Sequence, residues 1–430
     1  MRLAAGVVAL CLGAAMLCAQ APAVGASVEL RGTHHLGVPL HKKVGGSDDF
    51  DRVPHGARAK VEEVQEEGRW LRITLVPSGR AEWISSRYVG RVLPASPVAP
   101  APADPKDLAK VWQSGSSCLE VVSAGRRMAK SDPDALIVGT WNIRWFAKGC
   151  SPNETCPENR TDLDWLACSI AWMQVDVLAV QEVMRAAIDV EKLAVVLGKL
   201  NELTQGSWQW DFQECGNSSS QRVGFLWNGS RIKLSNRKDV WQLNPNAVNG
   251  DNACAGFLRP GRYARAEAVG GGADFNIIAV HLDSGTSDRD YQNRRKSVEA
   301  LTGIEIDGKP LPEIDADTIV LGDFNTMGRK EEPAISASQE IEAFREELRP
   351  AFQRVPGSLA CTEYFQDKGG VLDHMVVSAG MSEAAAAGRV SGYCAVRACA
   401  PFTGAPPAAY QRLSDHCPVL IEITNTDADQ

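Results

Sequence analysis

The sequence predicts an α/β protein in which two packed sheets are covered by helices, preceded by a small β-barrel. Two observations support this fold class. After residue 108, apolar runs of strand length alternate with helical patterns. Residues 27–92, in contrast, contain only short alternating runs with turn residues between them. A stretch rich in proline and alanine separates the two parts, so that at least two domains are expected in a chain of 430 residues.

The first segment, residues 1–26, has the pattern of a secretory signal peptide. Arg2 precedes an apolar run, and small residues around Ala26 form a cleavage site. No later apolar run reaches the length of a membrane-spanning helix, so we expect no transmembrane segment. The sequence therefore predicts a secreted protein, with the periplasm as the alternative location.

Residues 27–92 form the first predicted domain. Three runs alternate apolar and polar residues as half-buried strands do, namely residues 59–64, 69–75 and 81–84. Trp70, Gly79, Trp83 and the segment 85–89 resemble bacterial SH3-like domains. This resemblance implies an SH3-like β-barrel with a cell-wall or protein ligand, whereas the simpler interpretation makes both tryptophans core residues.

Residues 93–107 form the predicted linker, because five prolines stand there among alanines. Such a composition gives an extended, semi-rigid spacer. The second domain is therefore predicted to cover residues 108–430.

Strand and helix patterns are mixed in this second domain, which favours an α/β sandwich of two packed sheets. Strands are expected at residues 135–140, 175–180, 222–227, 263–269, 275–280, 318–321, 372–377 and 419–423. Helices are expected at residues 163–173, 188–203, 287–301 and 338–348.

Polar side chains collect at the ends of these strands. They are Asn142, Glu182, His281, Asp323, Asn325, Asp373, Asp415 and His416. Asp323 and Asn325 follow a buried run that Gly322 breaks, and a spacing of two places their side chains on the same side of an extended backbone. A single such residue would be explained by a turn. Eight at successive strand ends indicate a site.

Six motifs around these residues resemble those of the endonuclease/exonuclease/phosphatase family, the superfamily of deoxyribonuclease-I-like phosphodiesterases. They are Thr140-Trp-Asn142-Ile, Val180-Gln-Glu182-Val, Val280-His281-Leu, Leu321-Gly-Asp323-Phe-Asn325, Leu372-Asp373-His-Met and Ser414-Asp415-His416-Cys-Pro-Val. They occur in the family order and span nearly the whole second domain. The resemblance implies a four-layer α/β sandwich, dependence on Mg²⁺ (or Mn²⁺ or Ca²⁺), and cleavage of a phosphate ester by water.

The resemblance also implies a role for each residue. Glu182 would be the main metal ligand, completed or flanked by Asn142 and Asp415, since a hard divalent ion prefers oxygen ligands. His416 would contact the scissile phosphate or accept the proton of the attacking water, and Asp373 would bond its other ring nitrogen.

Three further roles follow from the same motifs. Asp323 would orient or activate the water, Asn325 would hold a phosphate oxygen, and His281 would donate to the phosphate or its leaving oxygen. The choice of general base between His416 and Asp323 stays open, as does the number of metal ions.

Two departures from the deoxyribonuclease pattern concern the partner of His281 and a tyrosine near the phosphate. Gln221 stands where a glutamate would pair with the histidine, and no tyrosine occurs around residues 218–220.

The leading hypothesis is a secreted metal-dependent nuclease acting on DNA or RNA, and we expect a monomer. The alternative is a sphingomyelinase-type lipid phosphodiesterase or a small-molecule phosphatase.

Charge and cysteine content constrain this hypothesis only weakly. The formal charge of −8 does not favour nucleic-acid binding, although bound cations reverse the local sign. The basic cluster Arg289, Arg294, Arg295 and Lys296 either contacts a polyanion or forms a solvated helix face.

Of twelve cysteines, ten follow the signal segment, and disulfides are expected in an oxidising compartment. The expected pairs are Cys394–Cys399, Cys150–Cys156 and Cys215–Cys254.

Overall fold

The computed structural model describes residues 22, 27–31, 38–44, 51–53, 57–76, 81–92, 105–150, 161–217, 220–385 and 387–427. The chain divides into two compact units, Met1–Ala99 and Pro100–Gln430, each described here by itself. The predicted signal segment lies outside the described residues apart from residue 22, so secretion stays a prediction. No helix formed by the described residues has the length and apolar character needed to cross a membrane.

The first unit is a small antiparallel β structure. Its main sheet has the order β6-β5-β4-β1-β7, and β2 pairs with β3 in a separate ribbon. The bounds are β1 Ser27–Leu30, β2 Val38–Leu40, β3 Asp51–Val53, β4 Arg58–Gln65, β5 Trp70–Val76, β6 Ala81–Ser85 and β7 Val89–Val92. The core contains Leu71 and Ile73, whereas Trp70 and Trp83 are only partly buried, so the interpretation of both as core residues is wrong. The SH3-like resemblance stays a prediction.

The second unit contains two six-stranded mixed sheets, as the sequence predicted. The first has the order β10-β11-β9-β8-β23-β22 and the second has the order β12-β13-β14-β17-β21-β18. The first sheet consists of β8 Leu136–Phe146, β9 Val177–Met184, β10 Trp208–Phe212, β11 Gln221–Asn228, β22 Arg389–Val390 and β23 Val419–Ile423. The second consists of β12 Ile232–Val240, β13 Gly261–Ala268, β14 Asp274–His281, β17 Thr318–Asp323, β18 Phe352–Val355 and β21 Asp373–Ser378.

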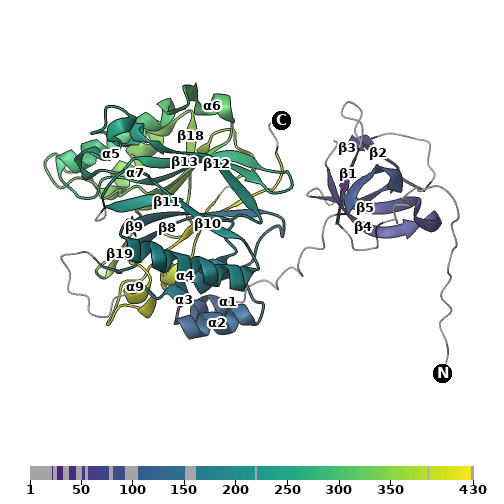
Figure 1. The fold of residues 1–430 in the computed structure, drawn as a ribbon, viewed down its shortest axis with the longest axis horizontal. Helices are drawn as coiled ribbons and strands as arrows, with labels where there is room; N and C mark the ends of the chain where they lie inside the picture. The colour runs from purple at the N-terminus through teal and green to yellow at the C-terminus, as the bar shows by residue number, and fades with distance from the viewer. Residues whose placement is uncertain are drawn as a thin grey trace. The chain divides into compact units, whose positions relative to one another are not determined.

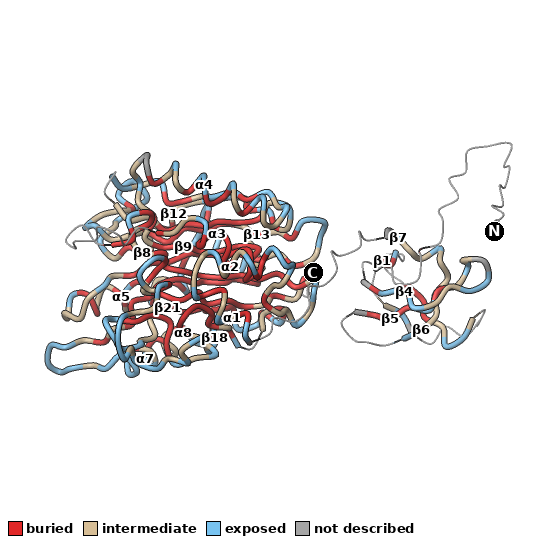
Figure 2. The backbone as a smooth tube through the Cα atoms, turned by 90° about the horizontal axis from the view of Figure 1, so that it is seen from below, coloured by how far each residue is buried: buried red, intermediate tan, exposed pale blue. Residues whose placement is uncertain are grey.

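Helices cover the outer faces of both sheets (Figure 1), and the buried residues concentrate in the strands between them (Figure 2). On the side of the first sheet lie α1 Pro105–Val111, α2 Gly115–Ser123, α3 Leu163–Met173 and α4 Ala187–Thr204. On the side of the second sheet lie α5 Asp288–Ala300, α6 Leu311–Ile314 and α7 Ala337–Leu348. Two shorter helices, α8 Gly392–Arg397 and α9 Ala408–Arg412, precede β23. These layers are consistent with the predicted α/β sandwich.

Each sheet has one parallel pair of strands at its centre. In the first sheet β8 runs parallel to β9, and in the second β14 runs parallel to β17. These strands are buried on both faces, which explains their continuous apolar sequences. The two pairs face each other, because β8 contacts β17 and β9 contacts β14. The carboxyl ends of all four strands can therefore contribute to one site, as strand ends commonly do in α/β proteins.

Two predictions about chain organisation need correction. Residues 105–107, predicted as part of the linker, form the start of α1, and Asp107 is buried there with Arg126 as its partner. The prediction of a Cys394–Cys399 disulfide is wrong. Cys394 pairs with Cys417, and Cys399 pairs with Cys361.

Of the other predicted disulfides, one can be compared with the structure. Cys215 pairs with Cys254, as expected, and Cys118 pairs with Cys168, which was not expected. The expected Cys150–Cys156 pair involves Cys156, which lies outside the described residues.

Candidate active site

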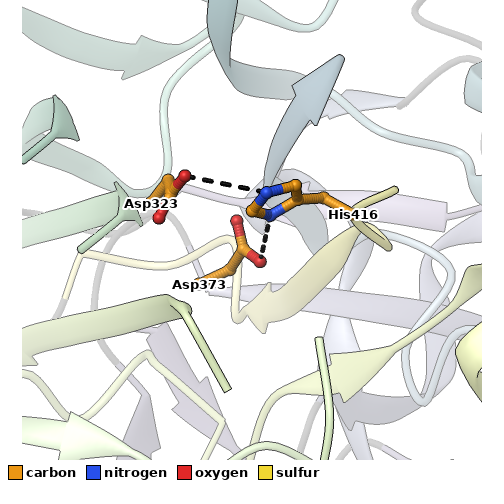
Figure 3. Close-up of side chains that lie close together, drawn as sticks. All are labelled: Asp323, Asp373 and His416. Atoms are coloured by element: carbon orange, nitrogen blue, oxygen red, sulfur yellow. Dashed lines mark hydrogen bonds and ion pairs between the residues drawn. The ribbon is translucent and has the colours of Figure 1, made fainter. Parts of the chain in front are cut away.

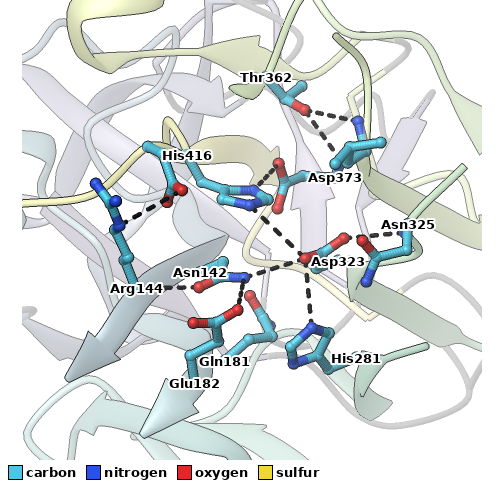
Figure 4. A network of polar contacts seen from close by, with 12 residues as sticks. Asn142, Arg144, Gln181, Glu182, His281, Asp323, Asn325, Thr362, Asp373 and His416 are labelled. Carbon is cyan, nitrogen blue, oxygen red and sulfur yellow. Dashed lines mark hydrogen bonds and ion pairs between the residues drawn. The ribbon is translucent and has the colours of Figure 1, made fainter. Parts of the chain in front are cut away.

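The eight strand-end residues lie together at the carboxyl ends of the two parallel pairs. Asn142 is in β8, Glu182 is in β9, His281 and Asp323 end β14 and β17, Asn325 follows β17, Asp373 begins β21, and Asp415 and His416 precede β23. Hydrogen bonds and ion pairs link most of them in one network (Figure 4). The structure thus brings together every site residue that the sequence indicated.

A distortion of β8 aims the first of these side chains. The β8–β9 register shifts between Asn142 and Phe146, and Arg144 and Trp145 both have positive φ, at 38° and 45°. The Asn142 side-chain oxygen accepts a hydrogen bond from the Arg144 backbone N–H at 3.0 Å. The Trp145 N–H donates to Glu182 Oε2 at 2.9 Å. Bulges of this kind commonly re-aim side chains beside active sites, and positive φ at such bulky residues marks strain held by the surrounding structure.

Asn142 connects the two sheets. Its Nδ2 donates to Glu182 Oε1 at 3.2 Å and to Asp323 Oδ2 at 3.0 Å. Burial raises the pKa of Glu182, and the neighbouring Asp415 raises it further, while the hydrogen bond from Asn142 lowers it. Two carboxylates that repel each other in a sheltered site favour the binding of a cation between them.

Asp323 and Asn325 form a turn and also belong to the site. The Asn325 backbone N–H donates to Asp323 Oδ1 at 2.9 Å, and Asn325 Nδ2 donates to the Leu282 carbonyl at 3.1 Å. The Asx-type turn that was the alternative interpretation is thus present. It leaves Asp323 Oδ2 facing Asn142 and two histidines.

His416 lies between two carboxylates (Figure 3). Its Nδ1 donates to Asp373 Oδ2 at 2.9 Å, and its Nε2 lies 3.8 Å from Asp323 Oδ2. Burial lowers the pKa of His416, but the charges of Asp373 and Asp323 outweigh burial and raise it well above its ordinary value. Asp373 itself is fixed by Thr362, whose hydroxyl accepts the Asp373 backbone N–H at 3.0 Å.

The protonation of Asp323 and His281 is set mainly by burial. Burial raises the pKa of Asp323 to about 7, with Asp373 adding to the rise and His416 opposing it. His281 Nε2 lies 3.5 Å from Asp323 Oδ2. Burial, with Arg259 and His416 nearby, lowers the pKa of His281 well below its ordinary value, so this imidazole is neutral.

No described carboxylate pairs with His281 Nδ1, in agreement with the glutamine at position 221. Gln221 instead accepts a hydrogen bond from Arg259 at 3.3 Å, and His281 Nδ1 has no partner among the residues described. Arg259 also donates to the carbonyls of His281 and Leu282, each at 3.0 Å. This guanidinium therefore takes part in the site, although no sequence motif indicated it.

Two more ionisable side chains were missed by the sequence analysis. Arg144 Nε lies 3.5 Å from Asp415 Oδ2. Glu363 forms an isolated antiparallel bridge with His416, so the two side chains lie on the same face. Burial raises the pKa of Glu363 to about 8, and the nearby carboxylates add to this rise. Arg144 lies two residues after Asn142, which could have drawn attention to it, but Glu363 gives no such signal.

The basic cluster on α5 does not form a free cationic surface. Arg294 is buried and pairs with Glu340 at 2.8 Å, and Arg295 pairs with Glu347 at 3.1 Å. Arg289 is exposed and pairs with Asp290 at 2.9 Å. The hypothesis that these arginines together contact a polyanion is therefore wrong for Arg294.

One group of described residues has the spacing of a metal site. Ligand atoms of Asp323, Asp373 and His416 lie within 4.8 Å of one another. However, His416 Nδ1 is already engaged by Asp373, and Mg²⁺ prefers oxygen ligands. The predicted ligands Asn142, Glu182 and Asp415 offer the oxygen atoms that a hard cation prefers, and their role as the metal site stays a prediction.

Comparisons with known proteins concern the fold. No protein-family model and no curated protein sequence matches this chain. Among solved structures, an endonuclease/exonuclease/phosphatase family protein from Bacteroides thetaiotaomicron matches 67% of this chain and 97% of its own, at 15% identity and a TM-score of 0.44. The human Nocturnin catalytic domain with bound sulfate matches 68% of this chain and 95% of its own, at 18% identity and a TM-score of 0.42. D. rerio TDP2 complexed with single-strand DNA product matches 67% of this chain and 98% of its own, at 14% identity and a TM-score of 0.44. These values are low, and the assignment of the site rests on its own geometry.

Proposed function

We propose that this protein is a secreted, metal-dependent nuclease that hydrolyses DNA or RNA by attack of water on the phosphodiester. The observation that carries the proposal is the position of Asp323. Its carboxylate lies between His281, His416 and Asn142, at distances of 3.0 to 3.8 Å. Six sequence motifs supply these residues in the order found in deoxyribonuclease-I-like phosphodiesterases, and the polar contacts among them in Figure 4 support the proposal.

Asp323 is the general base in this proposal. A general base works best when its pKa is close to the working pH, and burial raises the pKa of Asp323 to about 7. His416 has a raised pKa and keeps its proton, so it binds a phosphate oxygen as an imidazolium. Asp373 holds the Nδ1 of His416 and fixes the orientation of the ring.

The remaining residues stabilise charge on the phosphate. His281 is neutral and can donate a hydrogen bond from a ring nitrogen, and Asn325 can contact a phosphate oxygen. Glu182, Asp415 and Asn142 would hold the cation, which when bound neutralises charge that develops on the phosphate oxygens. The guanidiniums of Arg144 and Arg259 add positive charge close to the carboxylates.

The proposal is tested by incubating the full chain with supercoiled plasmid, single-stranded DNA, RNA, sphingomyelin and a phosphate monoester. Each substrate is tested with Mg²⁺ and with an excess of chelator. We expect cleavage of nucleic acid that requires Mg²⁺. Cleavage that survives chelation would contradict metal dependence. Turnover of sphingomyelin or of the monoester alone would favour the alternative phosphodiesterase or phosphatase function.

The roles of Asp323 and His416 are tested by substitution. We expect Asp323→Asn and His416→Ala each to lower kcat by roughly 10²- to 10⁴-fold, the usual contribution of a proton-transferring group. In the wild type, kcat should fall below about pH 7 as Asp323 becomes protonated, and this limb should be absent from the residual activity of Asp323→Asn. Arg289→Ala, at an exposed residue outside the site, is the control and should keep full activity. A His416→Ala enzyme with near wild-type kcat would show that the site is wrongly assigned.

The first unit has a separate proposed role. We propose that it is an SH3-like module that binds cell-wall material or a protein ligand, while the second unit acts as a monomeric catalyst. Co-sedimentation of the full chain with purified cell-wall fragments tests this role. Sedimentation that does not change when residues 1–99 are removed would contradict it.

A further inference from the structure

Phe257 is the most exposed large apolar side chain among the described residues, with 92% of its surface accessible. Its backbone has φ of 63°, and the preceding Gly256 has φ of 65°. A bulky residue rarely adopts this left-handed conformation, and it does so mostly where the surroundings enforce it. Both the exposure and the backbone of Phe257 therefore need an explanation.

The loop that carries Phe257 is tied down by specific contacts. Asn244 Nδ2 donates to the carbonyls of Ala253 at 2.8 Å, Ala255 at 3.0 Å and Leu258 at 3.4 Å. The Cys215–Cys254 disulfide anchors the same loop to the segment after β10. Phe257 is thus exposed on a well-anchored loop, which is the arrangement of a binding residue whose position is set in advance.

The loop also lies at the edge of the active site. Arg259, two residues after Phe257, donates to the backbone carbonyls of His281 and Leu282. Its guanidinium interacts electrostatically with Glu182 and Asp323. Two residues of extended chain span at most about 7 Å, so the backbone of Phe257 lies within about 7 Å of the backbone of Arg259, whose guanidinium reaches the site.

The surroundings of Phe257 indicate what it binds. Apart from Val248, the other strongly exposed side chains of the loop are polar, among them Asn249, Asp251 and Asn252. A membrane-inserting loop would present several apolar side chains and exclude carboxylates. A single exposed aromatic ring beside a phosphodiester site is instead suited to stacking on a nucleobase, because every base presents a π-face.

We propose that Phe257 stacks on an unpaired nucleobase next to the scissile phosphate. This inference rests on the proposed nuclease function and adds a preference for single-stranded or frayed nucleic acid, because a base inside a duplex is already stacked on both sides. Arg259 holds the loop beside the site, and Phe257 supplies the contact that is independent of base sequence.

The experiment measures binding in the His416→Ala background with Mg²⁺, so that the probes stay intact. The probes are a fluorescent thymidine oligonucleotide and an abasic oligonucleotide of the same length and charge. We expect the parent to bind the thymidine probe more tightly. Phe257→Ala should weaken that binding on the order of tenfold and leave the abasic probe unaffected, as expected for the loss of one base–aromatic stack. Phe257→Trp should retain the preference, and Val248→Ala, at a 75% exposed apolar residue of the same loop, is the matched control.

The outcomes separate this inference from the proposed function. A wild-type enzyme that cleaves oligonucleotides, together with a Phe257→Ala variant that binds both probes as its parent does, would overturn the stacking role alone. A parent with equal affinity for the two probes would also overturn it. If Phe257→Ala instead loses binding to phosphatidylcholine vesicles while its oligonucleotide affinity is unchanged, Phe257 is a lipid contact and the inference is wrong. Preserved base preference in a wild-type chain that cleaves no nucleic acid would overturn the nuclease function and keep the stacking role.

Discussion

Gly322 shows how one residue fixes the geometry of the site. Its φ is 154°, and a Cβ at this position would lie 2.0 Å from the Val280 carbonyl oxygen. That carbonyl belongs to β14, which pairs with β17 immediately before His281 and Asp323. The absence of a side chain therefore lets the two strands approach each other where both deliver a site residue.

Replacement of this glycine is expected to be costly. Gly322→Ala should lower the free energy of unfolding by about 2 kcal/mol or more, because the backbone must move and the new residue adopts a strained φ. Gly198→Ala, on the exposed side of α4 with no atom within 4 Å of the added Cβ, should instead stabilise by about 0.5–1 kcal/mol. Urea denaturation followed by circular dichroism measures both. Equal stability of Gly322→Ala and wild type would show that the strands tolerate a wider separation.

His374 predicts how stability depends on pH. Its Nδ1 accepts a hydrogen bond from Arg354 Nε at 2.9 Å, and its Nε2 lies 2.8 Å from the Thr326 hydroxyl. Burial, followed by the charge of Arg354, lowers the pKa of His374 well below 6.5. The folded protein thus holds a neutral histidine, whereas the unfolded chain takes up a proton near pH 6.5.

The sign of the effect follows from proton uptake. Below about pH 6.5 the unfolded state binds more protons, so stability is fully present above that pH and is lost as the pH falls towards the lowered pKa of the folded state. Each such histidine contributes a slope of up to about 1.4 kcal/mol per pH unit. His374→Asn keeps a polar side chain and removes the titration, so its unfolding free energy should vary less between pH 7.5 and 5.5. An unchanged slope in this variant would assign the pH dependence to other groups, such as His281.

Site residues could be predicted from the sequence where they fall in motifs at strand ends. Asp323, Asp373 and His416 are of this kind. Arg259 could not be found in this way, because it reaches the site from a loop and only the fold brings it to the carbonyl of His281. Glu363 was missed for the same reason, since its neighbour His416 lies far along the chain.

At the scale of elements, the apolar central strands and the four longest helices, α3, α4, α5 and α7, were predicted from the sequence. Strand β12 was not predicted because it is a polar strand at the edge of its sheet. Few of its residues are buried, and they lie near its two ends. The pairing of Cys394 was also missed. Spacing along the chain favoured Cys399, but Cys394 lies within α8, and the fold places it beside Cys417, two residues before β23. Pairings between residues that are distant in sequence thus cannot be predicted from local sequence patterns.

Helices α5 and α7 are joined by a buried ion pair. Arg294 Nε donates to Glu340 Oε1 at 2.8 Å, and its other nitrogens donate to the carbonyls of Gly285 and Gly328. Arg294→Ala would leave the Glu340 carboxylate buried without its partner, so we expect a loss of about 3–5 kcal/mol in unfolding free energy. Arg289→Ala, on the same helix but 82% exposed, should change stability by less than about 0.5 kcal/mol. Similar losses in both variants would contradict a structural role specific to Arg294.

The whole chain consists of two units with separate hydrophobic cores. The core of the first unit is formed by strands β1 to β6 and their neighbours, and the described cores of the second unit contain no described residue of the first. Helix α1 nevertheless belongs to the second unit. Trp165 Nε1 donates to the Val111 carbonyl at 2.7 Å, and the Trp112 and Trp141 rings pack edge to face with centroids 5.7 Å apart.

This organisation predicts where the chain can be shortened. A protein that begins at Pro100 retains α1 and every site residue, so we expect it to fold with a melting temperature equal to that of the second unit in the full chain, and with unchanged kcat on oligonucleotides. A protein that begins at Gly115 loses Trp112, whose removal alone should lower the unfolding free energy by roughly 3–5 kcal/mol. Calorimetry and the nuclease assay compare the two truncated proteins with the full chain. If the longer truncation is inactive or unfolded while the full chain is active, the first unit contributes to the catalytic fold and the two units are not independent.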